Sequence, residues 1–100
     1  MTVIDWLFSI EDKLVWVTGN NSLLDLHMAI RGYMEAVRHI NGNTCDPFFP
    51  GFQRYVEHAY GITMTSRSWS HIITDNTKDN NEAIMTFYNM LRDYVNTSMA

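Results

Sequence analysis

The stretch SLLDLHMAIRGYMEAVRHINGN, residues 22–43, decides the fold class of this chain. Its apolar side chains recur at intervals of three and four residues: Leu23, Leu26, Ile30, Tyr33, Val37 and Ile40. That spacing places them on one face of an α-helix. Ser22 and Asp25 form a capping signature, and Asn41-Gly42-Asn43 supplies a stop, because Gly and Asn accept the left-handed backbone that closes a helix. We therefore expect one long amphipathic helix, in which Gly32 indicates a close crossing with another helix.

A shorter helix is expected before this stretch. Thr2 and Asp5 resemble a capping box, and the apolar residues around them are again three and four apart: Val3, Leu7, Ile10 and Leu14. This spacing predicts a helix from about Thr2 to Asp12. The loop that follows contains Thr18-Gly19-Asn20-Asn21, residue types that favour turns.

Two helices are expected soon after the long one. The segment from Thr44 to Gly51 holds both prolines and is predicted to be the longest irregular connection. Pro50 suits the first turn of a helix that ends near Gly61. The inward residues of that helix are predicted to be Phe52, Tyr55, Val56 and Ala59. A helix of one or two turns is predicted from Ser68 to about Thr74.

A long last helix is expected to begin at Asp79 or Asn80, either of which can cap it. Its buried stripe is predicted to be Ala83, Ile84, Phe87, Leu91, Tyr94 and Val95. The helical spacing of these residues resembles that of the stretch at residues 22–43. We expect these two helices to be the long central members of the fold.

The chain as a whole is predicted to be one all-α domain, residues 1–100, built as a bundle of about five helices. One hundred residues are enough for a single hydrophobic core. Hydrophobic residues make up 46% of the chain and charged residues 18%, so the chain is expected to fold rather than remain disordered. No segment shows the sustained alternation of a β-strand, which leaves a helical bundle.

Charge and hydropathy disfavour two classes of function. Lys and Arg number 7 against 11 Asp and Glu, a net charge of -4, so the basic surface that direct nucleic-acid binding requires is not expected. No apolar run approaches the ~18 residues of a membrane span, and residues 1–10 lack the basic start of a secretory signal. We expect a soluble cytoplasmic protein without a membrane partner. The single Cys45 cannot form an internal disulfide and is predicted to be inert.

No catalytic or metal-binding constellation stands out. No two of the four histidines have the spacing of a metal-binding pair on a helix: His27, His39, His58 and His71. No glycine-rich phosphate loop is present, and neither a metal nor a cofactor is expected. Ser68, Ser70 and His71 lack a nucleophile elbow, and Ser68 is interpreted as a helix cap. Glu35 and His39 are four apart and could transfer a proton, but a solvated helix face explains them better.

Six residues are candidates for contacts with a partner protein: Asp46, Glu57, Asp75, Asp79, Glu82 and Trp16. Asp75, Asp79 and Glu82 gather before and within the first turn of the last helix. Carboxylates there stabilise a helix N-terminus, and together with Asp46 and Glu57 they can also steer the approach of a basic partner. Trp16 lies outside the regular apolar stripes, so it either closes the core or forms an interface hot spot.

Residues along most of the chain carry a resemblance to known proteins. In the first half they are Val3-Ile4-Asp5-Trp6-Leu7, Ile10, Gly19, Leu23, Leu26, Gly32-Tyr33 and Ala36. In the second half they are Phe49-Pro50-Gly51-Phe52, Val56, Tyr60-Gly61, Trp69, Ile72-Ile73, Glu82-Ala83, Phe87 and Tyr94. At these positions the sequence resembles small all-helical bacterial immunity proteins of toxin and immunity systems, among them contact-dependent growth inhibition systems.

The resemblance implies a protein made beside a toxin, which binds the C-terminal domain of that toxin and neutralises it by direct contact. Such toxins are often nucleases with basic substrate-binding surfaces, which suit an acidic partner. The resemblance implies no particular contact residues, because these vary with the cognate toxin.

Other functions remain compatible with the sequence. A cytosolic adaptor would bind a peptide or a helix in a groove, using Trp16 and the adaptable methionines. A small enzyme would use Glu35 and His39, or Ser70 and His71. A homodimer is also open, because surplus aromatic residues can be buried against a second copy.

Overall fold

The computed structural model describes residues 3–14, 19, 22–41, 51–63 and 65–98. Its helices are α1 (Val3–Ser9), α3 (Leu23–Asn41), α4 (Gly51–Ala59), α5 (Trp69–Asp75) and α6 (Asn80–Ser98). Within these residues there is no β-strand, which confirms the predicted all-α fold. None of the described helices combines the length and the hydropathy that crossing a membrane requires.

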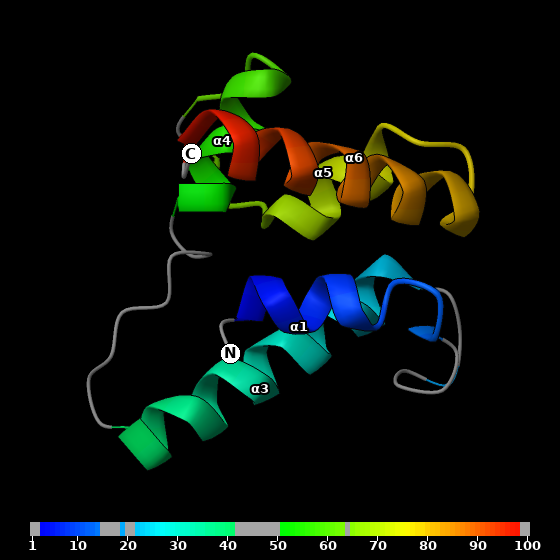
Figure 1. The fold of residues 1–100 in the computed structure, drawn as a ribbon. Coiled ribbons are helices and arrows are strands. Elements are labelled where there is room, and N and C mark those ends of the chain that lie inside the picture. Colours follow the sequence, from blue (N-terminus) through cyan, green and yellow to red (C-terminus); the bar gives the residue numbers. More distant parts are fainter. Residues whose placement is uncertain (1–2, 15–18, 20–21, 42–50, 64, 99–100) are drawn as a thin grey trace.

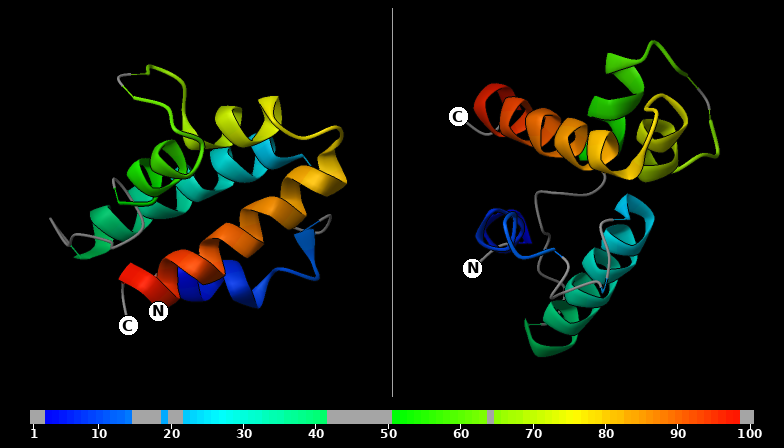
Figure 2. Two further views of the ribbon diagram at one scale, coloured as in Figure 1. Left: turned by 90° about the horizontal axis from the view of Figure 1, so that it is seen from above. Right: turned by 90° about the vertical axis from the view of Figure 1, so that its right-hand side faces the viewer.

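The helices form two layers (Figure 1). One layer contains α1 and α3, and the other contains α4, α5 and α6. Figure 2 shows the same division in a second direction. In both figures α3 begins close to the other layer and then diverges from it, so that its C-terminal end lies well away from α4, α5 and α6.

The core lies between the layers and contains an aromatic cluster formed by Phe52, Trp69, Phe87 and Tyr94. Phe52 of α4 is fully buried, and the centroid of its ring lies 5.4 Å from that of Trp69 and 5.6 Å from that of Phe87. Both ring pairs meet edge to face, a geometry that the aromatic quadrupole favours. Tyr94 meets Phe52 in the same way. The aromatic cluster therefore joins α4, α5 and α6.

The predicted stripe of α3 is confirmed over most of its length. Leu23, Leu26 and Ile30 are buried, and Tyr33 stacks on Trp6 of α1 with their ring centroids 4.6 Å apart. The prediction is wrong at its end, because 81% of Ile40 is exposed. The reason is the divergence of α3, which carries its last turn beyond the cover of the other layer (Figure 1).

Two further burial assignments differ from the sequence prediction. In α4 the inward residues Phe52 and Val56 are buried as predicted, but Ala59 is exposed. In α6 the stripe also includes Tyr88, which the spacing analysis did not single out. Its hydroxyl donates a hydrogen bond to the carbonyl oxygen of Leu7 at 2.8 Å. That bond satisfies the polar end of a buried ring and joins α6 to α1.

Three predicted helix ends are confirmed. The backbone N–H of Asp25 donates to the hydroxyl of Ser22 at 3.4 Å, and that of Glu82 donates to the Asp79 carboxylate at 2.8 Å. The chain leaves α4 through Gly61, whose φ of 66° is a left-handed conformation suited to glycine. The first helix is shorter than predicted: α1 ends at Ser9 and residues 10–12 form a turn. Thr2, Trp16, Cys45, Asp46 and Pro50 lie outside the described residues.

Gly32 does not mark a helix crossing, so that prediction is wrong. A Cβ atom at this position would meet no atom of the described residues within 4 Å. The close approach lies instead at Gly51, the first residue of α4, where a Cβ atom would collide with the hydroxyl of Tyr94 in α6. A side chain at position 51 would therefore require the Tyr94 ring to move.

Candidate functional site

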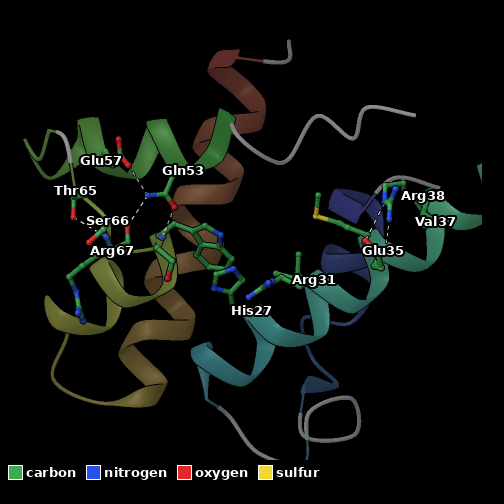
Figure 3. A pocket seen from close by; sticks show the side chains of 14 residues that line it. His27, Arg31, Glu35, Val37, Arg38, Gln53, Glu57, Thr65, Ser66 and Arg67 are labelled. Atoms are coloured by element: carbon green, nitrogen blue, oxygen red, sulfur yellow. Dashed lines mark hydrogen bonds and ion pairs between the residues drawn. The ribbon is translucent and has the colours of Figure 1, made fainter. Parts of the chain in front are cut away.

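An open groove of about 680 Å³ lies between the two layers. One wall is α3, and the other is formed by α4 together with residues 65–69 (Figure 3). A second hollow of about 450 Å³ adjoins the groove and shares five of its lining residues: His27, Arg31, Ser66, Arg67 and Ser68. The groove exists because α3 leans on α1 through the stacked Trp6 and Tyr33 rings, while its opposite flank diverges from α4.

Four groove-lining side chains form a row along α3, which we call the α3 row: His27, Arg31, Met34 and Arg38. Their spacing of four, three and four residues places them next to one another along the helix surface. Ile30 and Val37 border the row on its core side and add apolar surface. The α3 wall is therefore both polar and apolar. The half-buried thioether of Met34 lies between the guanidinium groups of Arg31 and Arg38.

Gln53 of α4 organises the opposite wall. Its amide Nε2 donates to the Glu57 carboxylate at 2.7 Å and to the carbonyl oxygen of Arg67 at 3.0 Å. Its amide oxygen accepts the backbone N–H of Trp69 at 2.6 Å, which satisfies one of the backbone donors at the start of α5. Because one amide holds α4, the Arg67 backbone and α5 together, this wall is preorganised (Figure 3).

The arginines of the groove differ in how their charge is balanced. Arg38 forms an ion pair with Glu35 at 2.6 Å, and Arg67 forms one with Asp75 at 2.8 Å. Arg31 makes no ion pair or hydrogen bond with any residue that the structure describes. Its side chain extends from α3 into the space between the walls, toward His27 (Figure 3). Arg31 is thus a cation that remains available for a ligand.

His27 forms the polar link between α3 and α5. Its Nδ1 lies 2.6 Å from the hydroxyl of the fully buried Ser70, and its ring contacts Trp69 with 4.6 Å between centroids. Burial lowers the pKa of His27 to about 4, and the nearby charges of Arg31 and His71 act in the same direction. At neutral pH this imidazole is therefore uncharged.

Hydroxyl groups connect His27 with His71. Ser68 Oγ lies 3.1 Å from Ser70 Oγ and 2.7 Å from His71 Nδ1. Ser68 is the N-cap residue of α5, as predicted, but its side chain makes no capping hydrogen bond, so that part of the prediction is wrong. The arrangement does not favour hydrolysis, because Ser70 is inaccessible to a substrate and an imidazole with the pKa of His27 is a weak base.

Glu35 and His39 lie on an exposed part of α3. The Glu35 carboxylate pairs with Arg38 and with His39, whose Nε2 is 3.1 Å away. Hydrogen bonding to Arg38 lowers the pKa of Glu35, which favours its charged form. A solvent-exposed carboxylate in this state suits a surface ion pair better than acid–base catalysis, where a raised pKa is useful.

The acidic candidates fall in two places. Glu57 lies in the α4 wall of the groove, where it accepts the hydrogen bond from Gln53. Asp75, Asp79 and Glu82 lie at the turn between α5 and α6. Asp75 pairs with Arg67, while the Asp79 carboxylate and the Glu82 backbone form the cap of α6. These carboxylates all have partners within the fold. Asp46 and Trp16 lie outside the described residues.

Among the described residues, no group of three or more His, Cys, Asp or Glu side chains is arranged to hold a metal ion. The sequence analysis did not single out Arg31, Gln53 and Arg67 as site residues, whereas Met34 is one of the methionines considered for an adaptor surface. The sequence signal for Arg31 is its place in the α3 row, which is recognisable only once the uncovered side of that helix is known; Gln53 and Arg67 have no such signal. Comparisons with family models, with curated proteins and with solved structures found no match for this chain.

Proposed function

We propose that this chain binds a partner protein through the groove and blocks the activity of that partner, without chemistry of its own. The observation that carries the proposal is the groove itself. It combines an apolar surface with fixed polar groups and a cation, Arg31, that has no ion pair among the described residues, and it is accessible along α3. The carboxylates of the α5–α6 turn are weaker support for a binding function, because Asp75 already pairs with Arg67 and Asp79 already caps α6.

The resemblance to immunity proteins supplies the class of partner. We propose that it is the C-terminal domain of a bacterial toxin, a nuclease in many such systems, which is neutralised in the cytoplasm. The chain has more acidic than basic residues, with a net charge of -4, which favours association with a partner of net positive charge. An adaptor that binds a helix of another protein would use the same groove and would differ in the identity of the partner.

Capture followed by a protection assay tests this proposal. The purified chain is immobilised, lysate from its own source is passed over it at moderate salt, and a protein retained in stoichiometric amount is identified. We expect that protein to arrest growth when it is expressed alone, and growth to recover when this chain is expressed with it.

A groove variant supplies the control for this assay. Met34→Lys adds a charge to the α3 row, and we expect it to abolish protection. Met85→Lys makes the same substitution at an exposed position of α6 outside the groove and is expected to protect fully. A retained partner that is not toxic would favour the adaptor, and the absence of any retained partner would refute a binding function.

A further inference from the structure

The groove leaves one side of the later turns of α3 without a neighbouring helix among the described residues. On one flank α3 packs against α1, where Trp6 stacks on Tyr33. On the other flank His27 packs against Trp69 and Ser70 of α5, whereas Arg31, Met34 and Arg38 line the groove without a described helix against them. A helix placed there would continue the cover that α5 gives to the first part of α3.

The spacing of the α3 row also favours a helix as the occupant. Residues at intervals of four, three and four residues face a partner helix that packs nearly parallel or antiparallel to their own. A peptide that binds by strand addition would need the free backbone groups of a sheet edge, and the described residues contain no strand. The row spans His27 to Arg38, about three helical turns, which is long enough to hold several anchor side chains of a partner helix.

The charges of the row determine the chemistry of that helix. Arg31 has no described partner, and Arg38 is balanced by a single exposed carboxylate, Glu35. A basic helix would place like charges against Arg31, whereas a carboxylate would pair with it close to the apolar surface of Met34 and Ile30. We infer that the groove binds an amphipathic helix of the partner, which presents an acidic side chain to Arg31 and an apolar side chain to Met34.

This inference rests on the proposed binding function and adds the chemistry of the bound segment. A partner protein that is basic overall can still bind in this way, because only the helix in the groove needs an acidic side chain. The acidic side chain faces α3, and the opposite side of the helix faces Gln53, Ser66 and Arg67. The hydroxyl of Ser66 then contributes to the polar part of the contact, whereas the Gln53 amide is already engaged within the wall.

Selection from a peptide library tests the inference without the natural partner. The probe is a displayed library of amphipathic helical peptides in which the positions facing the groove are randomised. It is selected in parallel against the wild-type protein, Arg31→Glu and Arg54→Glu. Arg54 is an exposed arginine of α4 outside the groove, so its substitution makes the same change of net charge.

The expected result is a charge preference that reverses. Peptides selected on the wild type and on Arg54→Glu should carry Asp or Glu one turn from an apolar anchor, and those selected on Arg31→Glu should carry Lys or Arg there. A selected acidic peptide should bind Arg31→Glu at least about tenfold more weakly than it binds the wild type, measured by fluorescence anisotropy. NMR shift changes should centre on His27, Arg31 and Gln53.

Two outcomes would overturn the inference. One is the absence of any selected peptide, and the other is a set of peptides without acidic preference, or with shift changes outside the groove. Either outcome leaves the capture and protection assay to decide the proposed function independently. Because Arg31 has no described ion pair, Arg31→Glu should retain the wild-type circular dichroism spectrum, so a loss of binding will not reflect unfolding.

Discussion

Replacing Phe52 by Ala is expected to lower the free energy of unfolding by about 3–5 kcal/mol, the range observed when a buried aromatic ring is removed from a core. The ring of Phe52 is fully buried and contacts each of the other three members of the aromatic cluster, so its removal leaves a cavity at the junction of α4, α5 and α6. Small domains have only about 5–15 kcal/mol of stability. Urea unfolding followed by circular dichroism measures the change.

Two further variants keep this prediction informative if Phe52→Ala fails to fold. Phe52→Leu retains most of the volume and is expected to cost less than half as much. Met85→Ala removes an apolar side chain of α6 that is 65% exposed, and it should change stability by no more than about 0.5 kcal/mol. A loss below about 1 kcal/mol for Phe52→Ala would contradict the central place of this ring in the core.

The stability of the protein is expected to fall as the pH is lowered below about 6.5, and His27 is the expected cause. Its pKa is about 4 in the folded protein, against 6.5 for the ordinary side chain, because the ring is partly buried beside Arg31. Between these two values the unfolded chain binds the proton more tightly, so the contribution of His27 is complete above pH 6.5 and is lost as the pH falls toward 4. Allowing for the solvent that reaches this ring, we expect about 1–2 kcal/mol.

The glutamine variant isolates this contribution from the other titrating groups. His27→Gln retains a hydrogen-bonding group near Ser70 but cannot be protonated. Its unfolding free energy, measured in urea between pH 7 and pH 5, should depend less on pH than that of the wild type. Equal pH dependence in the two proteins would show that His27 does not titrate in this range, and an NMR titration of its ring protons would check the pKa directly.

The sequence was sufficient to predict α3 and α6 because each has a long apolar stripe and a capping residue, and both signals are local. The sequence does not single out Tyr88 because the partner of its hydroxyl, the carbonyl oxygen of Leu7, is 81 positions away in the sequence. Ile40 was assigned to the core because its spacing continues the stripe. Spacing cannot show where a neighbouring layer ends.

The groove was harder to predict than the helices. The charge of Glu57 made it a candidate, and Glu57 does line the groove. No motif or charge cluster in the sequence marks Arg31 or Gln53 as a site residue. Arginine on a helix usually lies at a solvated surface, and the site arises from the angle at which α3 leaves the other layer. That angle follows from the packing of Tyr33 on Trp6 and of His27 on Trp69, both of which are tertiary contacts.

The aromatic cluster has a consequence for the order of folding. All four of its rings come from one continuous part of the chain, between Phe52 and Tyr94. Such contacts close shorter loops than the bond from Tyr88 to Leu7, and short loops form sooner. We expect α4, α5 and α6 to assemble first, which pulse-labelling hydrogen exchange would detect as early protection; earlier protection of α3 would contradict it. The layer that carries the α3 row would then dock last, so the binding groove would be completed only in the final step of folding.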